Sequence, residues 1–122
     1  MNAKRRVLVI EDDADAAATL ALLVRQMGHE VQTAANGAAA MQVARFFRPD
    51  IVLLDIVLPD IDGCDLAKDL KALPGLLDTQ IFAVTGHGDD LVRNRAYDSG
   101  CDGYFLKPLE PKVLERMLSK GI

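Results

Sequence analysis

Short apolar runs alternate along the whole chain with longer segments in which apolar residues recur at spacings of three and four. The runs are typical of buried strands, and the spacing is typical of helices with one apolar face. Their regular alternation predicts an α/β domain built around a parallel sheet. The predicted strands are Arg6–Ile10, Glu30–Ala34, Ile51–Leu54, Ile81–Val84 and Gly103–Leu106.

The predicted strands differ in polarity. The first, third and fourth contain unbroken runs of Val, Ile, Leu, Phe and Ala, as expected of central strands that are buried on both faces. The second strand, Glu30–Ala34, alternates polar and apolar residues. This alternation favours a position at the edge of the sheet.

The five predicted helices begin or end at residues that commonly bound a helix. These residues are Gly28 after the first helix, Asn36 before the second, Gly63 and Leu73 as approximate limits of the third, Asp89 or Asp90 before the fourth, and Pro111 at the start of the fifth. The inward stripe of the first helix is expected to comprise Ala16, Leu20, Leu23, Val24 and Met27. His29 follows that helix and is expected at the surface.

Length and composition limit the class of protein. The five strand–helix units use all 122 residues, so we expect a single domain over residues 1–122 with no effector domain. Half of the residues are hydrophobic, which excludes a disordered tail. The net charge of −4 argues against nonspecific binding to nucleic acid or to an anionic membrane.

Cysteine use and the lack of a long apolar segment indicate the compartment. Cys64 and Cys101 stand alone, without the spacing of a metal site or a disulfide framework. No run approaches 18 consecutive apolar residues, and the N-terminal residues do not resemble a signal peptide. We therefore expect a reduced cytoplasmic protein with two structural cysteines.

Charged and polar residues follow four of the five predicted strands. Glu11 and Asp12 follow the first strand, Asp55 the third, Thr85 the fourth and Lys107 the fifth. In open parallel sheets, ligands bind beyond the carboxyl ends of the strands. We therefore expect three carboxylates, a hydroxyl and an ammonium group to converge on one edge of the sheet.

This set of residues favours a hydrated metal ion and a phosphoryl group. Carboxylates about 4 Å apart repel by about 4 kcal/mol at an effective dielectric of 20, so the cluster is costly without a cation. Oxygen ligands without imidazole or thiolate favour Mg²⁺, with Mn²⁺ also possible, over Zn²⁺. Lys107 and Thr85 fit as ligands of a phosphoryl group. Asp55 is the best placed nucleophile, since aspartyl phosphates are known covalent intermediates.

Four segments together resemble the receiver domain of two-component response regulators, in the order and spacing of that family. They are Val7–Asp13, Asp55–Gly63, Val84–Gly86 and Gly103–Pro108. The resemblance covers nearly the whole chain. It implies a doubly wound, flavodoxin-like domain in which a parallel sheet of strand order 2-1-3-4-5 carries five helices on its two faces.

The resemblance also implies a role for each site residue. Asp55 would accept a phosphoryl group from a histidine kinase or a histidine phosphotransfer protein. Asp12 would bind Mg²⁺ directly, Glu11 largely through water, and Val57 through its main-chain carbonyl. Lys107 would pair with the phosphate, and the peptide bond that precedes Pro108 is typically cis in this family.

Signal output is implied by the same resemblance. Thr85 would move toward the phosphate and Tyr104 would rotate inward behind it. This changes the face formed by the fourth helix, the fifth strand and the fifth helix, which a downstream protein would bind. Val57 and His87 occupy the two variable positions that flank the path of the hydrolytic water, so we expect them to tune the lifetime of the phosphate.

Two other functions agree less well with the residues. A phosphatase of the haloacid dehalogenase type needs a second acid two residues after its nucleophile, where this chain has Val57. A flavin-binding electron carrier needs a hydroxyl-rich phosphate loop after the first strand, where Glu11 and Asp12 would repel phosphate. We therefore expect a signalling domain that assists its own phosphorylation and dephosphorylation, and not a turnover enzyme.

Overall fold

A computed structural model describes residues 4–86 and 88–120 of the chain. Its centre is a parallel sheet of five strands in the order β2-β1-β3-β4-β5. The interior strands are the three apolar ones, and the alternating strand β2 lies at an edge, as predicted. The strands are β1 (Arg6–Ile10), β2 (Glu30–Ala34), β3 (Ile51–Asp55), β4 (Gln80–Thr85) and β5 (Gly103–Leu106).

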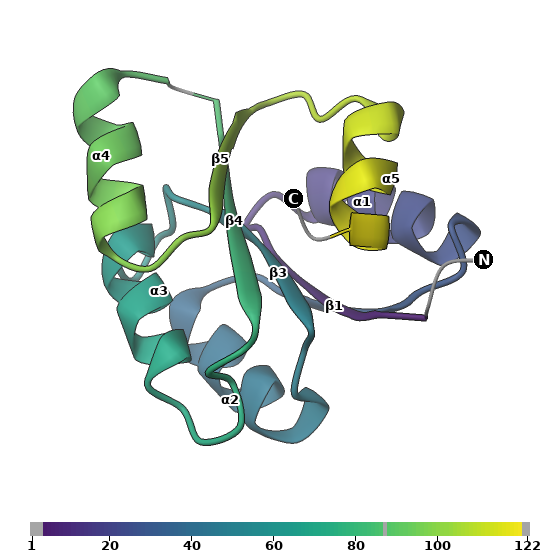
Figure 1. Cartoon of the computed structure of the whole chain (residues 1–122), viewed down its shortest axis with the longest axis horizontal. Coiled ribbons are helices and arrows are strands. Elements are labelled where there is room, and N and C mark those ends of the chain that lie inside the picture. The colour runs from purple at the N-terminus through teal and green to yellow at the C-terminus, as the bar shows by residue number, and fades with distance from the viewer. Residues whose placement is uncertain (1–3, 87, 121–122) are drawn as a thin grey trace.

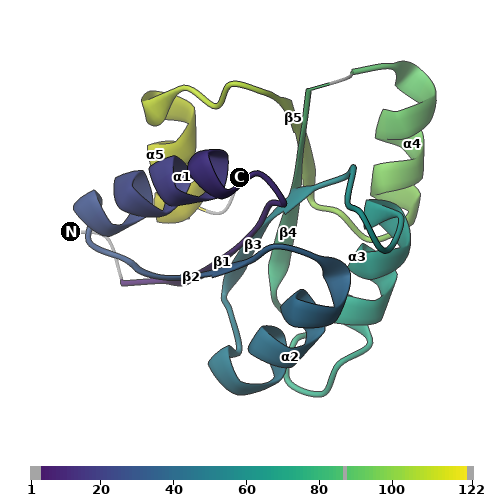
Figure 2. The ribbon, with the colours of Figure 1, turned by 180° about the vertical axis from the view of Figure 1, so that it is seen from behind.

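Helices cover both faces of the sheet. Figures 1 and 2 show α1 and α5 together on one face and α2, α3 and α4 on the other. The helices are α1 (Ala14–Gln26), α2 (Gly37–Phe47), α3 (Gly63–Lys71), α4 (Asp90–Asp98) and α5 (Pro111–Lys120). Within the described residues, none of them combines the length and apolar character that a membrane-spanning helix needs.

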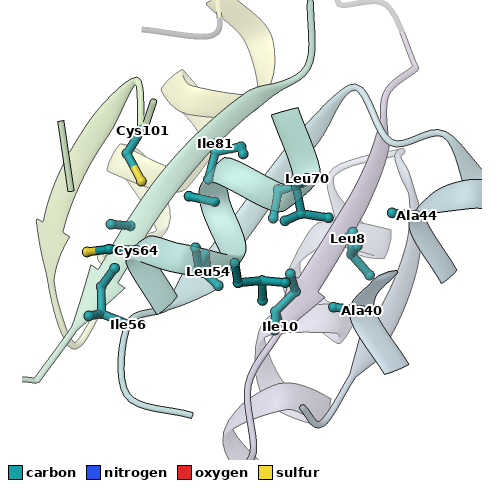
Figure 3. Packing of buried hydrophobic residues seen from close by; sticks show 14 of the residues in the cluster. Leu8, Ile10, Ala40, Ala44, Leu54, Ile56, Cys64, Leu70, Ile81 and Cys101 are labelled. Carbon is teal, nitrogen blue, oxygen red and sulfur yellow. The ribbon is translucent and has the colours of Figure 1, made fainter. Parts of the chain in front are cut away.

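The sheet separates two hydrophobic cores, because successive side chains of a strand point to opposite faces. Leu8 and Leu54 belong to the core under α2, α3 and α4 (Figure 3), whereas Val7 and Leu53 belong to the core under α1 and α5. The apolar runs of β1 and β3 therefore supply both cores at once. This explains why these strands show no polar alternation.

Both cysteines lie in the core under α2, α3 and α4. Cys64 and Cys101 are buried there as free thiols among aliphatic side chains (Figure 3). Burial raises the pKa of the Cys101 thiol to about 12. Thiols in this state pack as small apolar groups, which agrees with the structural role expected for them.

The inward stripe of α1 differs from the predicted one. Ala17, Ala21 and Val24 are its buried residues, whereas Ala16 is exposed. The predicted residues Leu20, Leu23 and Met27 are only partly buried and pack against the core that α1 shares with α5. The small residues Ala17 and Ala21 let α1 lie close to the sheet. The longer side chains of Leu20, Leu23 and Met27 contact the core from the sides of the helix. A second difference is that α3 ends at Lys71, two residues before the predicted Leu73.

His29 is buried, so the prediction of a surface position was wrong. Its side chain lies beside the segment that leads into β1, and its Nδ1 atom accepts a hydrogen bond from the Arg5 main-chain N–H at 2.9 Å. The Arg5 guanidinium in turn donates to the carbonyl oxygens of Leu118 and Ser119 near the end of α5, at 3.1 and 3.3 Å. His29 thus helps to attach the end of α5 to the start of the sheet.

We predict that acidification destabilises the fold through His29. Burial, with a smaller contribution from the Arg5 charge, lowers the pKa of His29 below its ordinary value of 6.5. The folded state disfavours protonation of His29. The stability contributed by neutral His29 is therefore complete above pH about 6.5 and is lost as pH falls through the lowered pKa. Urea unfolding at pH values from 7.5 to 5 should show a steeper loss of stability for the wild type than for His29→Gln. Parallel pH profiles of the two proteins would contradict this prediction.

A second prediction concerns Gly63, which begins α3. A Cβ atom at this position would lie 2.6 Å from both the Cα and the carbonyl oxygen of Ile56, and this backbone cannot move aside. Gly63→Ala should therefore destabilise the domain by about 1–3 kcal/mol, the usual cost of overpacking. Gly86→Ala is the matched control, because a Cβ atom there meets nothing within 4 Å. Equal urea midpoints for the two variants would show that the loop tolerates the added methyl group.

Candidate functional site

The carboxyl ends of β1, β3, β4 and β5 form one edge of the sheet. Glu11 and Asp12 follow β1, Asp55 ends β3, Thr85 ends β4 and Lys107 follows β5. The strand register aligns these ends, since Ile10 pairs with Leu54, and Asp55 pairs with Val84. The convergence expected from the strand-end positions is therefore present in the structure.

Three carboxylates form a tight group at this edge. One oxygen atom from each of Glu11, Asp12 and Asp55 lies within 4.8 Å of the other two. Glu11 and Asp55 are buried, whereas Asp12 is exposed and opens the group to solvent. Two unit charges at such a distance repel by roughly 3 kcal/mol at an effective dielectric of 20, so a cation is strongly favoured here.

Lys107 supplies part of the missing positive charge. Its ammonium group contacts the Glu11 carboxylate and donates to Asp55 Oδ2 at 3.1 Å. Burial opposes the charged form of this lysine, but the hydrogen bonds and charges of Glu11 and Asp55 outweigh it and raise the pKa of Lys107. One ammonium group beside three carboxylates leaves an excess of negative charge at the site.

Asp55 is held by both of its carboxylate oxygens. Oδ1 accepts a hydrogen bond from the main-chain N–H of Val57 at 3.0 Å, and Oδ2 accepts the one from Lys107. The side chain of Val57 projects outward and is 61% exposed. The two Asp55 oxygens are therefore oriented by the loop that follows β3 and by Lys107 after β5, while the Val57 side chain of that loop is open to solvent.

The loop from Ile56 to Asp62 is fastened to three helices. Asp62 caps α3 by accepting the Cys64 N–H on Oδ1 at 2.8 Å, and its Oδ2 pairs with Arg95 of α4 at 3.0 Å. Burial opposes the charged form of Asp62, but Arg95 and the Cys64 N–H outweigh it and lower the pKa of Asp62. Asp60 accepts the first two N–H groups of α2, from Gly37 and Ala38, at 2.8 and 3.0 Å.

The contact between Asp60 and α2 was not predicted from the sequence. An Asp shortly before Gly63 is expected, from the adjacent sequence, to form a turn or to cap α3. Asp62 has that role. Asp60 instead caps a helix whose first residue lies 23 positions earlier in the chain. Hydrogen bonds from the Gly37 and Ala38 N–H groups lower the pKa of Asp60. No signal near Asp60 in the sequence reveals this contact.

The other predicted site residues lie in β4, in β5 and in the segments that follow them. Thr85 is buried at the end of β4, and its main-chain carbonyl accepts the N–H of Lys107 at 2.8 Å. Tyr104 is half-buried in β5, where it pairs with Ala83. The Lys107–Pro108 peptide bond is cis, as the resemblance implies. His87 lies outside the described residues.

The residues of this site fit a hard divalent cation. The donor set consists of carboxylate oxygens, it carries more negative than positive charge, and Asp12 faces solvent. Mg²⁺ prefers such ligands and usually keeps several of its waters. The group of Glu11, Asp12 and Asp55 could therefore hold a metal ion.

An apolar groove runs beside the acidic group. It lies between α1 and the connection from β5 to α5, and both Glu11 and Lys107 line it at the end next to the site. Its apolar lining comes mainly from Leu20, Leu23, Val84, Pro108 and Leu109. The groove therefore adjoins the only ammonium group found near the three carboxylates in the described part of the chain.

Comparison with known proteins places these features in a family. The sequence model described as response regulator receiver domain matches residues 7–119. The DNA-binding response regulator MtrA of Mycolicibacterium paratuberculosis is 35% identical over 111 residues, which are 91% of this chain and 48% of that protein. The chain thus spans about half the length of the curated relatives it matches.

Solved structures agree with this relationship. A putative response regulator from Chloroflexus aurantiacus is 32% identical, with a TM-score of 0.85 over 94% of this chain and 95% of that one. A CheY-like receiver domain protein from Methanospirillum hungatei is 24% identical, with a TM-score of 0.90 over 98% and 94%, and it supports the fold. Because the family model covers almost the whole chain and the fold agrees, the chain belongs to the response regulator receiver domains of two-component signalling.

Proposed function

We propose that Asp55 is the phospho-acceptor of this domain and receives its phosphoryl group from a phosphohistidine of a histidine kinase or a histidine phosphotransfer protein. The observation that carries the proposal is the geometry of Asp55. Its two oxygens are oriented by the Val57 N–H and the Lys107 ammonium, and it lies within an acidic group that favours a cation. Asp55 is buried, and it lies at an edge that opens to solvent through the exposed Asp12.

The transfer exchanges one bond to phosphorus for another. A carboxylate oxygen of Asp55 attacks phosphorus, the P–N bond to the donor imidazole breaks, and the imidazole nitrogen leaves with the bonding electron pair and takes up a proton. Lys107 already donates a hydrogen bond to the attacking carboxylate of Asp55, so its charge can stabilise a phosphoryl oxygen during the transfer. The Thr85 hydroxyl, at the end of the adjacent strand, can donate a hydrogen bond to a second phosphoryl oxygen.

Mg²⁺ fits this site, with Mn²⁺ as an alternative. We propose that Asp12 and Asp55 bind it directly, Glu11 through water, and Val57 through its main-chain carbonyl. When bound, the ion neutralises negative charge on the transferring group and on the carboxylates. The contribution of the chain would be to hold these oxygens together, and the strand register, which brings Glu11, Asp12 and Asp55 close, supports this.

We propose that the donor protein docks in the groove between α1 and the β5–α5 connection. The groove brings an apolar surface to the edge of the acidic site, so a partner seated there would present its phosphohistidine toward Asp55. This position keeps the opposite side of the site, near α4, available for output.

Output would pass through the face formed by α4, β5 and α5. We propose that Thr85 and Tyr104 respond to the phosphate and that a downstream protein reads the altered face. The side chains of Leu91 in α4 and Leu106 in β5 are 77% and 56% exposed, so apolar surface is present on this face. A phosphorylation event at Asp55 then biases an equilibrium between two arrangements of the face.

The phospho-acceptor is tested by direct labelling. Incubation with a small phosphodonor and Mg²⁺ should add one phosphoryl group to the wild type, because Asp55 is the oriented carboxylate. Asp55→Asn should abolish the addition, since an amide is not a nucleophile toward phosphorus. Intact-mass analysis provides the measurement, and Asp65→Asn, at an exposed position in the first turn of α3, provides the control. Equal labelling of Asp55→Asn and the wild type would overturn the assignment.

A further prediction concerns the lifetime of the phosphate. The exposed apolar side chain of Val57 cannot orient the attacking water, and His87 is expected to shield the phosphate, so the acyl phosphate should be long-lived. Val57→Asn and His87→Ala should each accelerate its hydrolysis. A time course of phosphate release from the three phosphorylated proteins measures this. Identical decay rates would show that neither residue tunes the lifetime.

A further inference from the structure

The Asp62 carboxylate connects the loop from Ile56 to Asp62 to two helices at once. Oδ1 accepts the Cys64 N–H and so caps α3, while Oδ2 accepts a hydrogen bond from the Arg95 guanidinium of α4 at 3.0 Å. The backbone of Asp62 also forms an antiparallel bridge with Val57. The residue bound by Arg95 is therefore the direct neighbour, across the loop, of the residue whose carbonyl is proposed to join the metal site.

The loop between Val57 and Asp62 cannot move independently of its ends. The Gly63 N–H donates to the Ile56 carbonyl at 2.9 Å, and the absence of a side chain at Gly63 lets the two backbones lie in contact. At its middle, Asp60 is bound to the start of α2. These contacts tie the position of Asp62 to that of Val57, its partner in the bridge across the loop.

Helix α4 is the most weakly embedded partner of this loop. Ala96 is its only buried residue, whereas α3 buries five of its nine. The Arg95–Asp62 pair adds a directed contact to this small apolar attachment. Both side chains are partly exposed, at 55% and 38%, so the contact can break without leaving a buried charge unpaired.

We propose that Arg95 is a positioning residue that couples α4 to the metal and phosphoryl site through Asp62. This inference rests on the proposed function of Asp55. Arg95 stabilises the arrangement of Asp62 in which the neighbouring Val57 donates its main-chain N–H to the Asp55 carboxylate. Because coupling between two sites is reciprocal, a metal ion or phosphoryl group that favours this arrangement also favours the position of α4 that keeps the ion pair.

The chain offers a matched control for this proposal. Arg93 also lies on α4 but pairs with Asp90 of the same helix, at 3.3 Å, and is 51% exposed. Arg93→Gln thus removes the same charge from the same helix without removing a contact to the loop. Asp62→Asn completes a double-mutant cycle with Arg95→Gln, because asparagine keeps the Oδ1 oxygen that caps α3 and replaces the Oδ2 acceptor of the Arg95 hydrogen bond by an uncharged NH₂ group.

The experiment is a Mg²⁺ titration of the full chain that is monitored by NMR of the backbone amides. The chain contains no tryptophan whose fluorescence could report binding. Arg95→Gln should weaken Mg²⁺ binding about two- to fivefold, the range that an exposed ion pair supports. Arg93→Gln should leave the affinity unchanged. Asp62→Asn should match Arg95→Gln, and the double variant should bind no more weakly than either single one.

A second readout needs no metal. Hydrogen exchange of the Gly63 amide should be faster in metal-free Arg95→Gln than in the wild type or Arg93→Gln, while the free energy of unfolding of the whole domain stays nearly equal. Normal Mg²⁺ binding by the wild type with unchanged affinity and exchange in Arg95→Gln would overturn this inference alone. Strictly additive losses in the double variant would also overturn it. Absence of both Mg²⁺ binding and labelling of Asp55 in the wild type would overturn the proposed function as well.

Discussion

Electrostatic repulsion among three carboxylates at the carboxyl edge of the sheet is the constraint on which the site depends. Glu11, Asp12 and Asp55 are brought within 4.8 Å of one another because their strands are parallel and in register. Lys107 offsets part of the repulsion from the end of β5. The remaining negative charge favours a divalent cation at this edge, and the proposed phosphoryl transfer to Asp55 depends on such a cation.

The loop after β3 connects this charged group to the rest of the fold. Its residues cap two helices and pair with a third, so the surroundings of Asp55 are tied to α2, α3 and α4 through single carboxylates. On the opposite side, the Lys107 N–H is bound to the Thr85 carbonyl. Under the proposed function, a change of charge at Asp55 would act on α4 through this loop and on β5 through Lys107.

Much of the fold could be predicted because local patterns determine it. The apolar runs of β1, β3 and β4 require burial on both faces, which only interior strands of a parallel sheet provide. Caps such as Asn36, Asp62 and Asp89 bind N–H groups two or three residues away, so their function can be recognised from adjacent sequence. The placement of Glu11, Asp55, Thr85 and Lys107 at one edge was predictable for a related reason, since each ends or directly follows a strand whose carboxyl end lies at that edge.

The contacts that sequence could not supply join groups far apart in the chain. His29 is buried against Arg5, Asp60 caps α2, and Arg95 pairs with Asp62, at separations of 24, 23 and 33 residues. Each depends on which loops the strand order brings together, and on side-chain lengths that decide whether two groups meet. The sequence by itself determined the strands, the helix caps and the carboxylates at the strand ends, because these follow from periodicity and local hydrogen bonding. Only the tertiary structure decided how the loop beside Asp55 is attached to its helices, because that attachment is made by contacts through space.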